Sequence, residues 1–472
     1  VKASNGIRTH DLFITSETLY QTELSRHERY LLRVYKKRYW FKGMKISISG
    51  IRGVYGNDFL PNDVLRFCDG FSKLIKNGKC VIGRDTRETG EMIEKLVSAR
   101  LLERGIEVHH LGITPTPVVF RKAKEIGAGI IITSSHNPLD WNGLKFIIDG
   151  RGITLDELEI VKNGKNSNEN KIGREFISES NYISDAVNII GKLNKTQQVT
   201  VDIGGGAAKT VAPKLLQEIG CQVETINDNL EGCSRGPDPT SDKLAELVSK
   251  TKNIGFAFDL DSDRVILVMN GEKKSSDITL GLGVVKAIKL GIKKFVLSLD
   301  SSLAIEKFII KNGGKVWRSK VGEANVIQMM IENDAEAGGE GSSGGFILRK
   351  FNMCRDGLLT SGLIASMIDD ESIQKDIEFF ESFSQIREKI SIESKLHERV
   401  IERLTKKLGE KYEINQLDGV RVTINENTWS LIRKSNTEDI IRISTESNDR
   451  ELLVKIQKEM IEMVENCYEE IK

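Results

Sequence analysis

The sequence lacks the features that mark several large classes of protein. Its six cysteines are scattered without a Cys-x-x-Cys pair, which is typical neither of a disulfide framework nor of a zinc site. No apolar run reaches the roughly 18 residues that suggest a transmembrane helix, and the first residues do not follow the charged-then-apolar order of a signal peptide. We therefore expect a soluble, cytoplasmic protein whose cysteines are reduced.

An excess of one charge is also missing. Lysine and arginine number 69 and aspartate and glutamate 68, which leaves a formal net charge of +1. This balance gives no reason to expect nucleic acid or an anionic membrane as a partner. Any anion that the protein binds must be held by local groups.

Three segments repeat one order of elements: an apolar strand, a polar loop, an amphipathic helix, a glycine and a second strand. They lie at about 79–111, 198–226 and 293–319. Apolar residues three and four apart predict the helices, and each helix ends in a glycine that tolerates a left-handed cap. Alternating strands and helices indicate mostly parallel sheets covered by helices.

After about residue 380 the pattern changes. A charged helix is expected over 384–412, then short strands near 419–424, 429–434 and 439–445, and a last helix from about Asp449. We therefore expect three similar α/β domains at 44–172, 173–272 and 273–378, and a smaller α+β domain at 379–472.

Residues 1–43 fit none of these patterns, because they have no steady period and are rich in basic and aromatic residues. Back-translation of Gly6 to Thr9 can give the complement of the T-arm sequence of a transfer RNA gene. We expect a non-native upstream extension, with translation from Met44; a disordered basic tail is the alternative. A chain that starts at Met44 is expected to keep its stability and activity, since an irregular tail buries little apolar area.

The stretch GAGIIITSSHNPLDWNGLKF, Gly127 to Phe146, places hydroxyls and an imidazole directly after a buried-strand run. Ligands of open α/β sheets bind at the carboxyl ends of the strands. A serine at that position is a candidate nucleophile or phosphate carrier, with His136 and Asn137 beside it. A polar turn is the alternative for this stretch taken alone.

A second stretch, GFAFDLDSDRVILV, carries Asp259, Asp261 and Asp263 at the end of another apolar strand. Alternate residues of an extended chain point the same way, so these carboxylates should converge. A divalent cation would remove their repulsion, and carboxylates without histidine favour Mg²⁺ over Zn²⁺. An EF-hand is excluded, because Arg264 stands where its loop needs glycine and Asn270 where it needs glutamate. A solvated acidic turn is the alternative.

Two further loops are rich in hydrogen-bonding groups. RKSNTEDIIR contains groups that suit a phosphate monoester: Arg433, Ser435, Asn436, Thr437 and Arg442. AGGEGSSGGF combines glycines, which let a backbone approach a ligand, with Glu340, Ser342 and Ser343. A polar hairpin is the alternative for the first loop, and a glycine-rich loop by itself does not define a site.

Together and in this order, the stretches resemble the α-D-phosphohexomutase family, which includes phosphoglucomutases, phosphomannomutases and phosphoglucosamine mutases. SGIRG, Ser49 to Gly53, is similar to the family's opening motif, TSSHNPLDWNGLK to its phosphoserine loop, DLDSDR to its metal loop, GGEGSSGG to its sugar-contacting loop and RKSNTED to its phosphate loop. The likeness extends from about Lys45 to the C-terminus. It implies three similar α/β domains with mixed sheets and a C-terminal α+β domain around one active-site cleft.

The resemblance also implies a reaction and a set of site residues. A phosphoryl group would move between the 1- and 6-positions of a hexose phosphate, through a phosphoserine enzyme and a hexose 1,6-bisphosphate. By this likeness Ser135 is the phosphoserine, Ser134 is its non-catalytic neighbour, and the three aspartates hold Mg²⁺ with the phosphate of Ser135. The other implied residues are Lys145, Arg52 and His136 for catalysis, and Arg264, Glu340, Ser342, Ser343, Arg433, Ser435, Asn436, Thr437 and Arg442 for substrate binding. The preferred hexose and the choice between monomer and homodimer stay open.

The sequence departs from the family's usual motifs in several loops. Gly344-Gly345 stands where many relatives have histidine after the sugar-loop glycine, and Ser342-Ser343 carries one extra residue. Proton transfer is therefore not assigned to this loop. Lys434 and Asp439 stand where proline is usual, and Ile48-Ser49 stands where Thr-Asp or Thr-Ser is common.

Three alternative functions remain at this point. An aspartyl-phosphate phosphatase would use Asp259 as nucleophile and Asp261 as acid, but it leaves TSSHNP and RKSNTE without a role. An alkaline-phosphatase-like enzyme needs histidine metal ligands, and beyond residue 43 there are only His109, His110, His136 and His397. The third alternative is a catalytically weak sugar-phosphate sensor.

Overall fold

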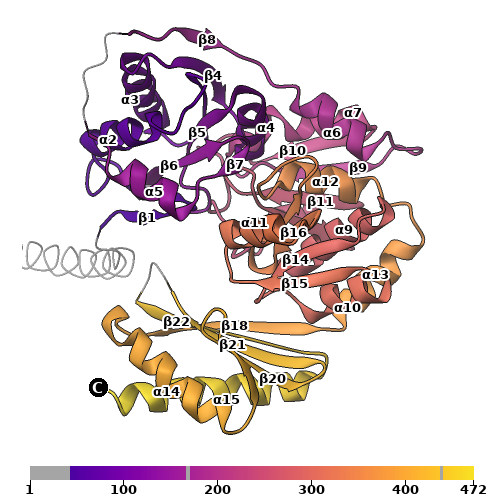
Figure 1. The fold of residues 1–472 in the computed structure, drawn as a ribbon. Helices are drawn as coiled ribbons and strands as arrows, with labels where there is room; N and C mark the ends of the chain where they lie inside the picture. The colour runs from indigo at the N-terminus through magenta and orange to yellow at the C-terminus, as the bar shows by residue number, and fades with distance from the viewer. Residues whose placement is uncertain (1–42, 166–170, 436–438) are drawn as a thin grey trace, which may run out of the picture. The chain divides into compact units, whose positions relative to one another are not determined.

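The computed structural model describes residues 43–165, 171–435 and 439–472. Residues 44–472 form one compact unit that contains four β-sheets (Figure 1). Within the described ranges, no helix combines the length and the apolar composition needed to cross a membrane.

The first sheet is mixed and has eight strands. In pairing order these are β1 (Lys45–Ser47), β2 (Gly50–Val54), β6 (Trp141–Ile148), β5 (Ala128–Ile132), β3 (Lys79–Arg84), β4 (Glu107–Ile113) and β8 (Glu175–Ile177), with β7 (Arg151–Gly152) beside β6. Strand β3 is parallel to β4 and β5, whereas β6 is antiparallel to β2 and β5. Strand β8 comes after residue 172, the expected end of the first domain, and is parallel to β4.

Helices cover both faces of this sheet. On one face lie α2 (Pro61–Ser72), α3 (Gly90–Glu103) and α5 (Leu155–Lys162), and on the other α4 (Thr116–Ile126). Neighbouring residues of β3 divide between the faces: Cys80 and Ile82 pack toward the first group of helices and Val81 toward α4. Burial on both faces explains the unbroken apolar runs of β3 and β5.

The second and third sheets repeat this plan. The second sheet has the order β10 (Gln222–Ile226), β9 (Gln198–Asp202), β11 (Ile254–Phe258), β12 (Val265–Met269), β13 (Glu272–Lys273), and the third β15 (Lys315–Ser319), β14 (Lys294–Ser298), β16 (Ala337–Glu340), β17 (Gly345–Leu348). In each, three neighbouring strands are parallel, and the third of them forms an antiparallel hairpin with the next strand, β11–β12 or β16–β17.

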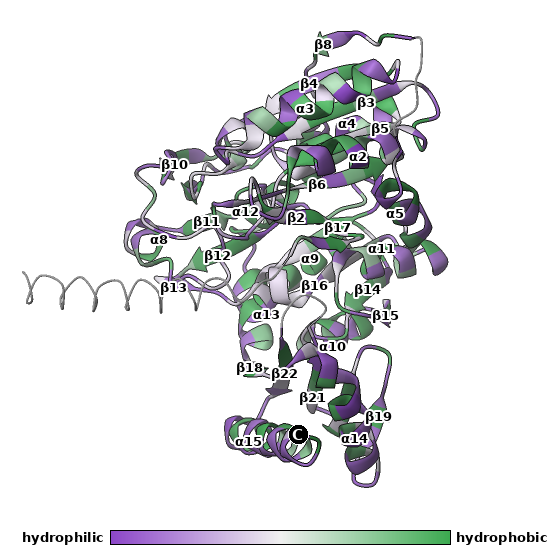
Figure 2. Ribbon diagram, turned by 90° about the vertical axis from the view of Figure 1, so that its left-hand side faces the viewer, coloured by the Kyte–Doolittle hydropathy of each residue, from purple (hydrophilic) through white to green (hydrophobic). Residues whose placement is uncertain are grey.

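Most helices of these two domains pack into one hydrophobic core, which joins residues of both sheets, whereas α8 and α11 pack into separate clusters. In chain order the helices are α6 (Tyr182–Ile190), η1 (Ala207–Thr210), α7 (Ala212–Ile219), α8 (Ala245–Lys250), α9 (Ser276–Lys289), α10 (Leu303–Lys311), α11 (Glu323–Glu332), η2 (Gly341–Ser343), α12 (Gly357–Ala365) and α13 (Ser372–Glu381). Strands β11 and β12 are buried along their whole length and are coloured as hydrophobic in Figure 2.

The three predicted repeats are confirmed as β3–α3–β4, β9–α7–β10 and β14–α10–β15. The glycines that follow the three helices, Gly105, Gly220 and Gly313, have φ values of 70°, 111° and 72°. This left-handed region costs little only for glycine, so these residues let the chain turn back into the second strand of each repeat. The predicted α/β class with mixed sheets is therefore correct.

The last domain has an antiparallel sheet covered by two helices. Its order is β18 (Ser384–Ser391), β22 (Ile440–Ser447), β21 (Thr428–Lys434), β20 (Val420–Asn425), β19 (Glu413–Asn415); the helices are α14 (His397–Gly409), preceded by η3 (Ser394–Leu396), and α15 (Arg450–Glu469). The helix expected over 384–412 is wrong in its first part, because all eight residues of β18 pair with β22. Ile386 and Ile390 lie four residues apart, a spacing that fits either a helix face or one face of a strand.

A buried polar cluster joins the first three domains. Tyr182 Oη donates to Asp356 Oδ1 at 2.5 Å, and Asn352 Nδ2 donates to Asp356 Oδ2 at 2.8 Å and to Pro117 O at 3.1 Å. Asp356 also caps α12 by accepting from Leu359 N at 2.9 Å. Burial raises the pKa of Asp356 to about 6, although these donors favour its ionised form.

Replacing Tyr182 with phenylalanine should therefore destabilise the fold in a pH-dependent way. At pH 8, where Asp356 is ionised, we expect a loss of about 1.5–3 kcal/mol, the scale of a hydrogen bond to a charged group. The loss should shrink at pH 5, below the folded-state pKa of about 6, because the protonated carboxyl depends less on the donor. Thermal unfolding at both pH values measures this. The control is Tyr412→Phe, which removes a partly exposed hydrogen bond of 3.1 Å to Glu459. An equal loss of stability in both variants, with the same pH dependence, would contradict the account.

Candidate active site

Ser135 lies in a sharp turn just after the carboxyl end of β5. Its side chain is fully buried and its φ is 51°, a left-handed conformation that costs a non-glycine residue on the order of 1 kcal/mol. Its Oγ donates to Asp259 Oδ2 at 2.8 Å and lies 3.3 Å from His136 Nδ1. The turn therefore directs the hydroxyl toward Asp259, which lies in the loop between β11 and β12, here called the aspartate loop.

Arg87 and Asp85 hold this turn in place. The Arg87 guanidinium donates to four carbonyl oxygens of the loop, those of Ser135 (2.6 Å), Asn137 (2.8 Å), Trp141 (2.7 Å) and Pro138. Asp85 accepts from Arg87 Nε at 3.1 Å and from Thr133 Oγ1 at 2.6 Å, and Thr133 Oγ1 accepts from Ser135 N at 2.8 Å. Sequence reasoning missed this role, because the contacts join residues up to 54 positions apart.

The three aspartates converge in the loop between β11 and β12. One carboxylate oxygen of each lies within 4.8 Å of the others, and all three side chains are fully buried. Lys145 Nζ, from β6, donates to Asp261 Oδ2 at 2.7 Å and to Asp263 Oδ2 at 2.9 Å. The expected convergence of Asp259, Asp261 and Asp263 is therefore present in the folded chain.

The charges and donor atoms of this cluster suit a divalent cation. Burial, together with Asp261 and Asp263, raises the pKa of Asp259 well above its ordinary value. Burial also opposes the ionisation of Asp263, but Arg355 and Lys145 outweigh it and hold its pKa well below the ordinary value. The Oδ1 atoms of Asp261 and Asp263 are buried and accept no hydrogen bond from any residue in the described ranges. Such all-oxygen donors fit Mg²⁺.

Three of the expected site residues, Arg52, His136 and Arg264, gather around the serine turn. Arg52, on β2, donates to Asn137 Oδ1 at 3.0 Å, and burial lowers its pKa. Burial, followed by the charges of Arg264 and Arg52, also holds the pKa of His136 well below its usual range, so the imidazole is neutral at pH 7. Arg264 Nη2 lies 3.4 Å from His136 Nε2. Two guanidinium groups thus lie close to the turn that carries Ser135.

Glu340 is the last residue of β16, and Arg355 links it to the aspartate loop. Ser342 Oγ donates to Glu340 Oε1 at 3.3 Å, and Ser343 Oγ donates to the Glu340 carbonyl at 3.1 Å. Arg355 Nη1 donates to Glu340 Oε2 at 2.9 Å and its Nη2 to Asp263 Oδ2 at 2.8 Å. Sequence reasoning did not find Arg355, because the surrounding FNMCRDG carries no motif that was singled out.

The predicted phosphate loop follows β21 in the last domain. Its Asn436 and Thr437 lie outside the described residues. Arg433 and Arg442 stand directly opposite each other on β21 and β22, so their side chains leave the sheet on the same face. Arg433 Nη1 lies 3.7 Å from Asp418 Oδ2, and Ser435 is buried. An anion bound on this face would offset the repulsion between the two guanidinium groups.

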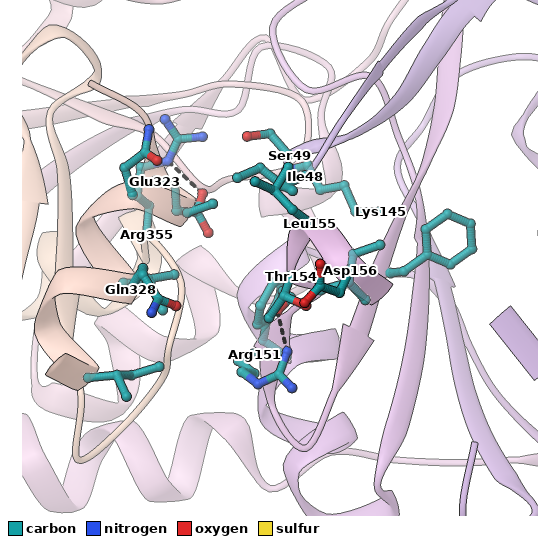
Figure 3. Close-up of a pocket in the computed structure, with 18 of the residues that line it drawn as sticks. Ile48, Ser49, Lys145, Arg151, Thr154, Leu155, Asp156, Glu323, Gln328 and Arg355 are labelled. Carbon is teal, nitrogen blue, oxygen red and sulfur yellow. Dashed lines mark hydrogen bonds and ion pairs between the residues drawn. The ribbon is translucent and has the colours of Figure 1, made fainter. Parts of the chain in front are cut away.

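A cavity of about 510 Å³ is lined in part by Arg52, Lys145 and Arg355. Figure 3 shows Ser49 and Lys145 on one of its walls and Glu323 and Arg355 on the other. The two walls come from the first domain and from the region of α11 in the third domain. Lys145 and Arg355 both line this space, and each also forms an ion pair with Asp263.

Comparisons with known proteins identify the family of the chain. Four models match in succession: phosphoglucomutase/phosphomannomutase, alpha/beta/alpha domain I at 43–171, domain II at 180–272, domain III at 277–383 and C-terminal domain at 392–463. The chain is 35% identical over 450 residues to a probable phosphoglucosamine mutase of Methanosphaera stadtmanae, covering 89% of this chain and 97% of the relative. It is 34% identical over 450 residues to the phosphoglucosamine mutase of Methanococcus maripaludis, covering 89% and 98%.

Solved structures share the fold. A phosphoglucomutase/phosphomannomutase family protein of Burkholderia thailandensis gives a TM-score of 0.78 at 22% identity, covering 90% of this chain and 98% of its own. N-acetylphosphoglucosamine mutase of Aspergillus fumigatus, solved with GlcNAc-6P and magnesium, gives 0.54 at 14% identity, covering 82% of each chain.

The four matched domains and the closely related mutases define the class of this protein, which is a phosphomutase and thus an isomerase. More narrowly, the chain belongs to the α-D-phosphohexomutase family, because all four of its domains match the family's models.

Proposed function

We propose that this protein interconverts the 1- and 6-phosphates of a hexose, with glucosamine phosphate as the preferred substrate and glucose and mannose phosphates as the other candidates. The observation that carries the proposal is the 2.8 Å hydrogen bond from Ser135 Oγ to Asp259. It joins the candidate phosphate carrier to the candidate cation site, as a phosphoserine mechanism requires. The names of the relatives from Methanosphaera stadtmanae and Methanococcus maripaludis support the amino sugar.

In the proposed cycle, phosphorylated Ser135 gives its phosphoryl group to the free hydroxyl of a hexose phosphate. The bond from phosphorus to Ser135 Oγ breaks, a bond from phosphorus to the sugar oxygen forms, and the hydroxyl proton ends on Ser135 Oγ. His136, 3.3 Å from Ser135 Oγ, together with Lys145 and Arg52, would handle the proton and the developing charge. The resulting 1,6-bisphosphate turns around and returns its other phosphoryl group to Ser135.

Asp259, Asp261 and Asp263 would hold Mg²⁺ in this scheme. When bound, Mg²⁺ would offset the charge of the transferring phosphoryl group and polarise it. Lys145 already bridges Asp261 and Asp263 through their Oδ2 atoms, which fixes the orientation of both carboxylates. Glu340, Ser342 and Ser343 would bind sugar hydroxyls, and Arg433, Ser435, Asn436, Thr437 and Arg442 the phosphate that is not transferred, with Arg264 as a further substrate contact.

The phosphatase alternative is less well supported. It would make Asp259 the nucleophile, but Asp259 Oδ2 accepts the hydrogen bond from Ser135 Oγ. A serine directed at the triad has a role in a phosphoserine enzyme and none in an aspartyl-phosphate one.

Substrate preference can be measured with a panel of glucosamine, N-acetylglucosamine, glucose and mannose 1-phosphates. Each is incubated with Mg²⁺ and a trace of the matching 1,6-bisphosphate, and formation of the 6-phosphate is followed. We expect conversion with the highest kcat/KM for glucosamine 1-phosphate. Conversion of none of the four would contradict the proposed mutase reaction, and preference for another sugar would contradict only the substrate assignment.

Arg433→Ala should mainly weaken substrate binding. Loss of one guanidinium contact to a phosphate is worth about 1.5–3 kcal/mol, which raises KM roughly 10- to 100-fold. The turnover number should change much less, because this phosphate is not transferred. Steady-state kinetics measure both quantities, with Arg399→Ala, an exposed arginine of α14 in the same domain, as the control. A fall in kcat without a rise in KM would assign Arg433 a structural role.

A further inference from the structure

Arg355 connects three loops through one buried guanidinium. Its Nη2 donates to Asp263 Oδ2 at 2.8 Å and its Nη1 to Glu340 Oε2 at 2.9 Å. Its Nε lies 3.0 Å from Glu323 Oε2 in an ion pair (Figure 3). The side chain is only 8% exposed. Carboxylates of the aspartate loop, the sugar loop and α11 therefore share a single positive charge.

Gly345 makes room for this arginine. A Cβ atom at position 345 would lie 2.2 Å from Arg355 Cδ and 2.7 Å from its Cγ, both far too close. The methylene stem of Arg355 thus occupies the space that a side chain at 345 would need. This contact gives a physical reason for the second glycine of the Gly344-Gly345 pair.

The aspartate loop, which carries Asp263, and the sugar loop, which follows Glu340, depend on Arg355 to different degrees. Asp263 has a second ion pair, with Lys145 at 2.9 Å. Glu340 has an ion pair with Arg355 and with no other residue of the described ranges. Losing the guanidinium contact should therefore disturb the sugar loop first.

We propose that Arg355 is a positioning residue that holds the Glu340 carboxylate in the orientation that binds the sugar, and that Gly345 is needed to admit it. The inference rests on the proposed function, in which Glu340 contacts sugar hydroxyls. Arg355 acts through the Glu340 carboxylate, to which its Nη1 donates at 2.9 Å. Substrate affinity, rather than turnover, is the quantity it controls.

Arg355→Lys separates position from charge. Lysine keeps the positive charge, but its compact ammonium group lacks the planar fork that reaches three carboxylates at once. Gly345→Ala displaces the arginine while keeping every charge. Matched controls are Arg349→Lys, whose side chain is 36% exposed beside Asp334, and Gly232→Ala, where an added Cβ meets no atom within 4 Å.

The test measures kcat and KM for glucosamine 1-phosphate, and the Kd for glucosamine 6-phosphate by titration calorimetry. For Arg355→Lys and Gly345→Ala we expect KM and Kd to rise about tenfold or more, the scale of one charge-assisted hydrogen bond, with kcat nearly unchanged. For both controls, KM and Kd should stay within about twofold of the unaltered protein. The Kd of the double variant should be at most about twofold higher than that of the single variant that binds more weakly.

Several results would overturn the proposal. These are an unchanged KM and Kd in either variant, a fall confined to kcat, or full additivity in the double variant. Failure of both variants to fold would also overturn it, because Arg355 would then be a structural residue. If the unaltered protein neither converts nor binds these sugar phosphates, the proposed function is wrong, which is a distinguishable outcome.

Discussion

Ser135→Ala is expected to lower mutase turnover by about 10⁴-fold or more, the scale of deleting an essential nucleophile. Without the hydroxyl there is no oxygen on which the phosphoryl group can be carried between the two half-reactions. The variant should nevertheless fold. It loses one hydrogen bond to Asp259, worth about 1 kcal/mol, while the Arg87 contacts to the backbone of the turn remain.

The neighbouring Ser134 provides the control for this experiment. Its side chain is also fully buried, and its Oγ lies 3.2 Å from Asn137 Oδ1 rather than near the aspartates. Ser134→Ala should keep most of its turnover. If Ser134→Ala were the inactive variant and Ser135→Ala the active one, the nucleophile would have been assigned to the wrong serine.

Asp261→Asn is expected to weaken Mg²⁺ binding about 100-fold or more and to lower turnover with it. The substitution removes one of three converging charges and replaces a ligand oxygen pair by an amide. Asp261 Oδ2 also accepts from Thr116 and Lys145, and the substitution removes the ion pair between Lys145 and residue 261 while that with Asp263 remains. Calorimetric titration with Mg²⁺ and the Mg²⁺ dependence of turnover measure the two effects separately.

Asp228→Asn is the matched control, because Asp228 is an exposed aspartate of the same domain. It should leave both Mg²⁺ affinity and turnover within about twofold. Full activity of the unaltered enzyme in excess EDTA would contradict the metal assignment. So would an Asp261→Asn variant whose Mg²⁺ titration matches that of the unaltered protein.

The elements that the sequence predicted correctly are those whose signals are local. The three strand–helix–glycine repeats depend on spacing within about 30 residues, and they form as expected. The convergence of Asp259, Asp261 and Asp263 follows from alternation along one short stretch. Ser135 was assigned from the resemblance to the α-D-phosphohexomutase family, and its role as the phosphoserine stays a prediction.

The features that sequence reasoning missed depend on contacts between distant parts of the chain. The sequence of β18 predicts a charged helix, because its pairing with β22, more than 40 residues later, leaves no local signal. Arg87 and Arg355 each hold loops that come from other elements. In the sequence, Gly345 is one of several loop glycines. Only the folded structure shows that the methylene stem of Arg355 packs against it.

The most direct test of the phosphoserine account is to locate the phosphate on the enzyme. The protein is incubated with glucosamine 1,6-bisphosphate labelled with ³²P, digested and mapped by mass spectrometry, before and after a chase with unlabelled glucosamine 6-phosphate. The account predicts label on Ser135 that passes into the sugar phosphates during the chase. Label on Asp259 would indicate an aspartyl-phosphate enzyme, and label on Ser135 that the chase does not remove would indicate a sensor; either result would contradict the account.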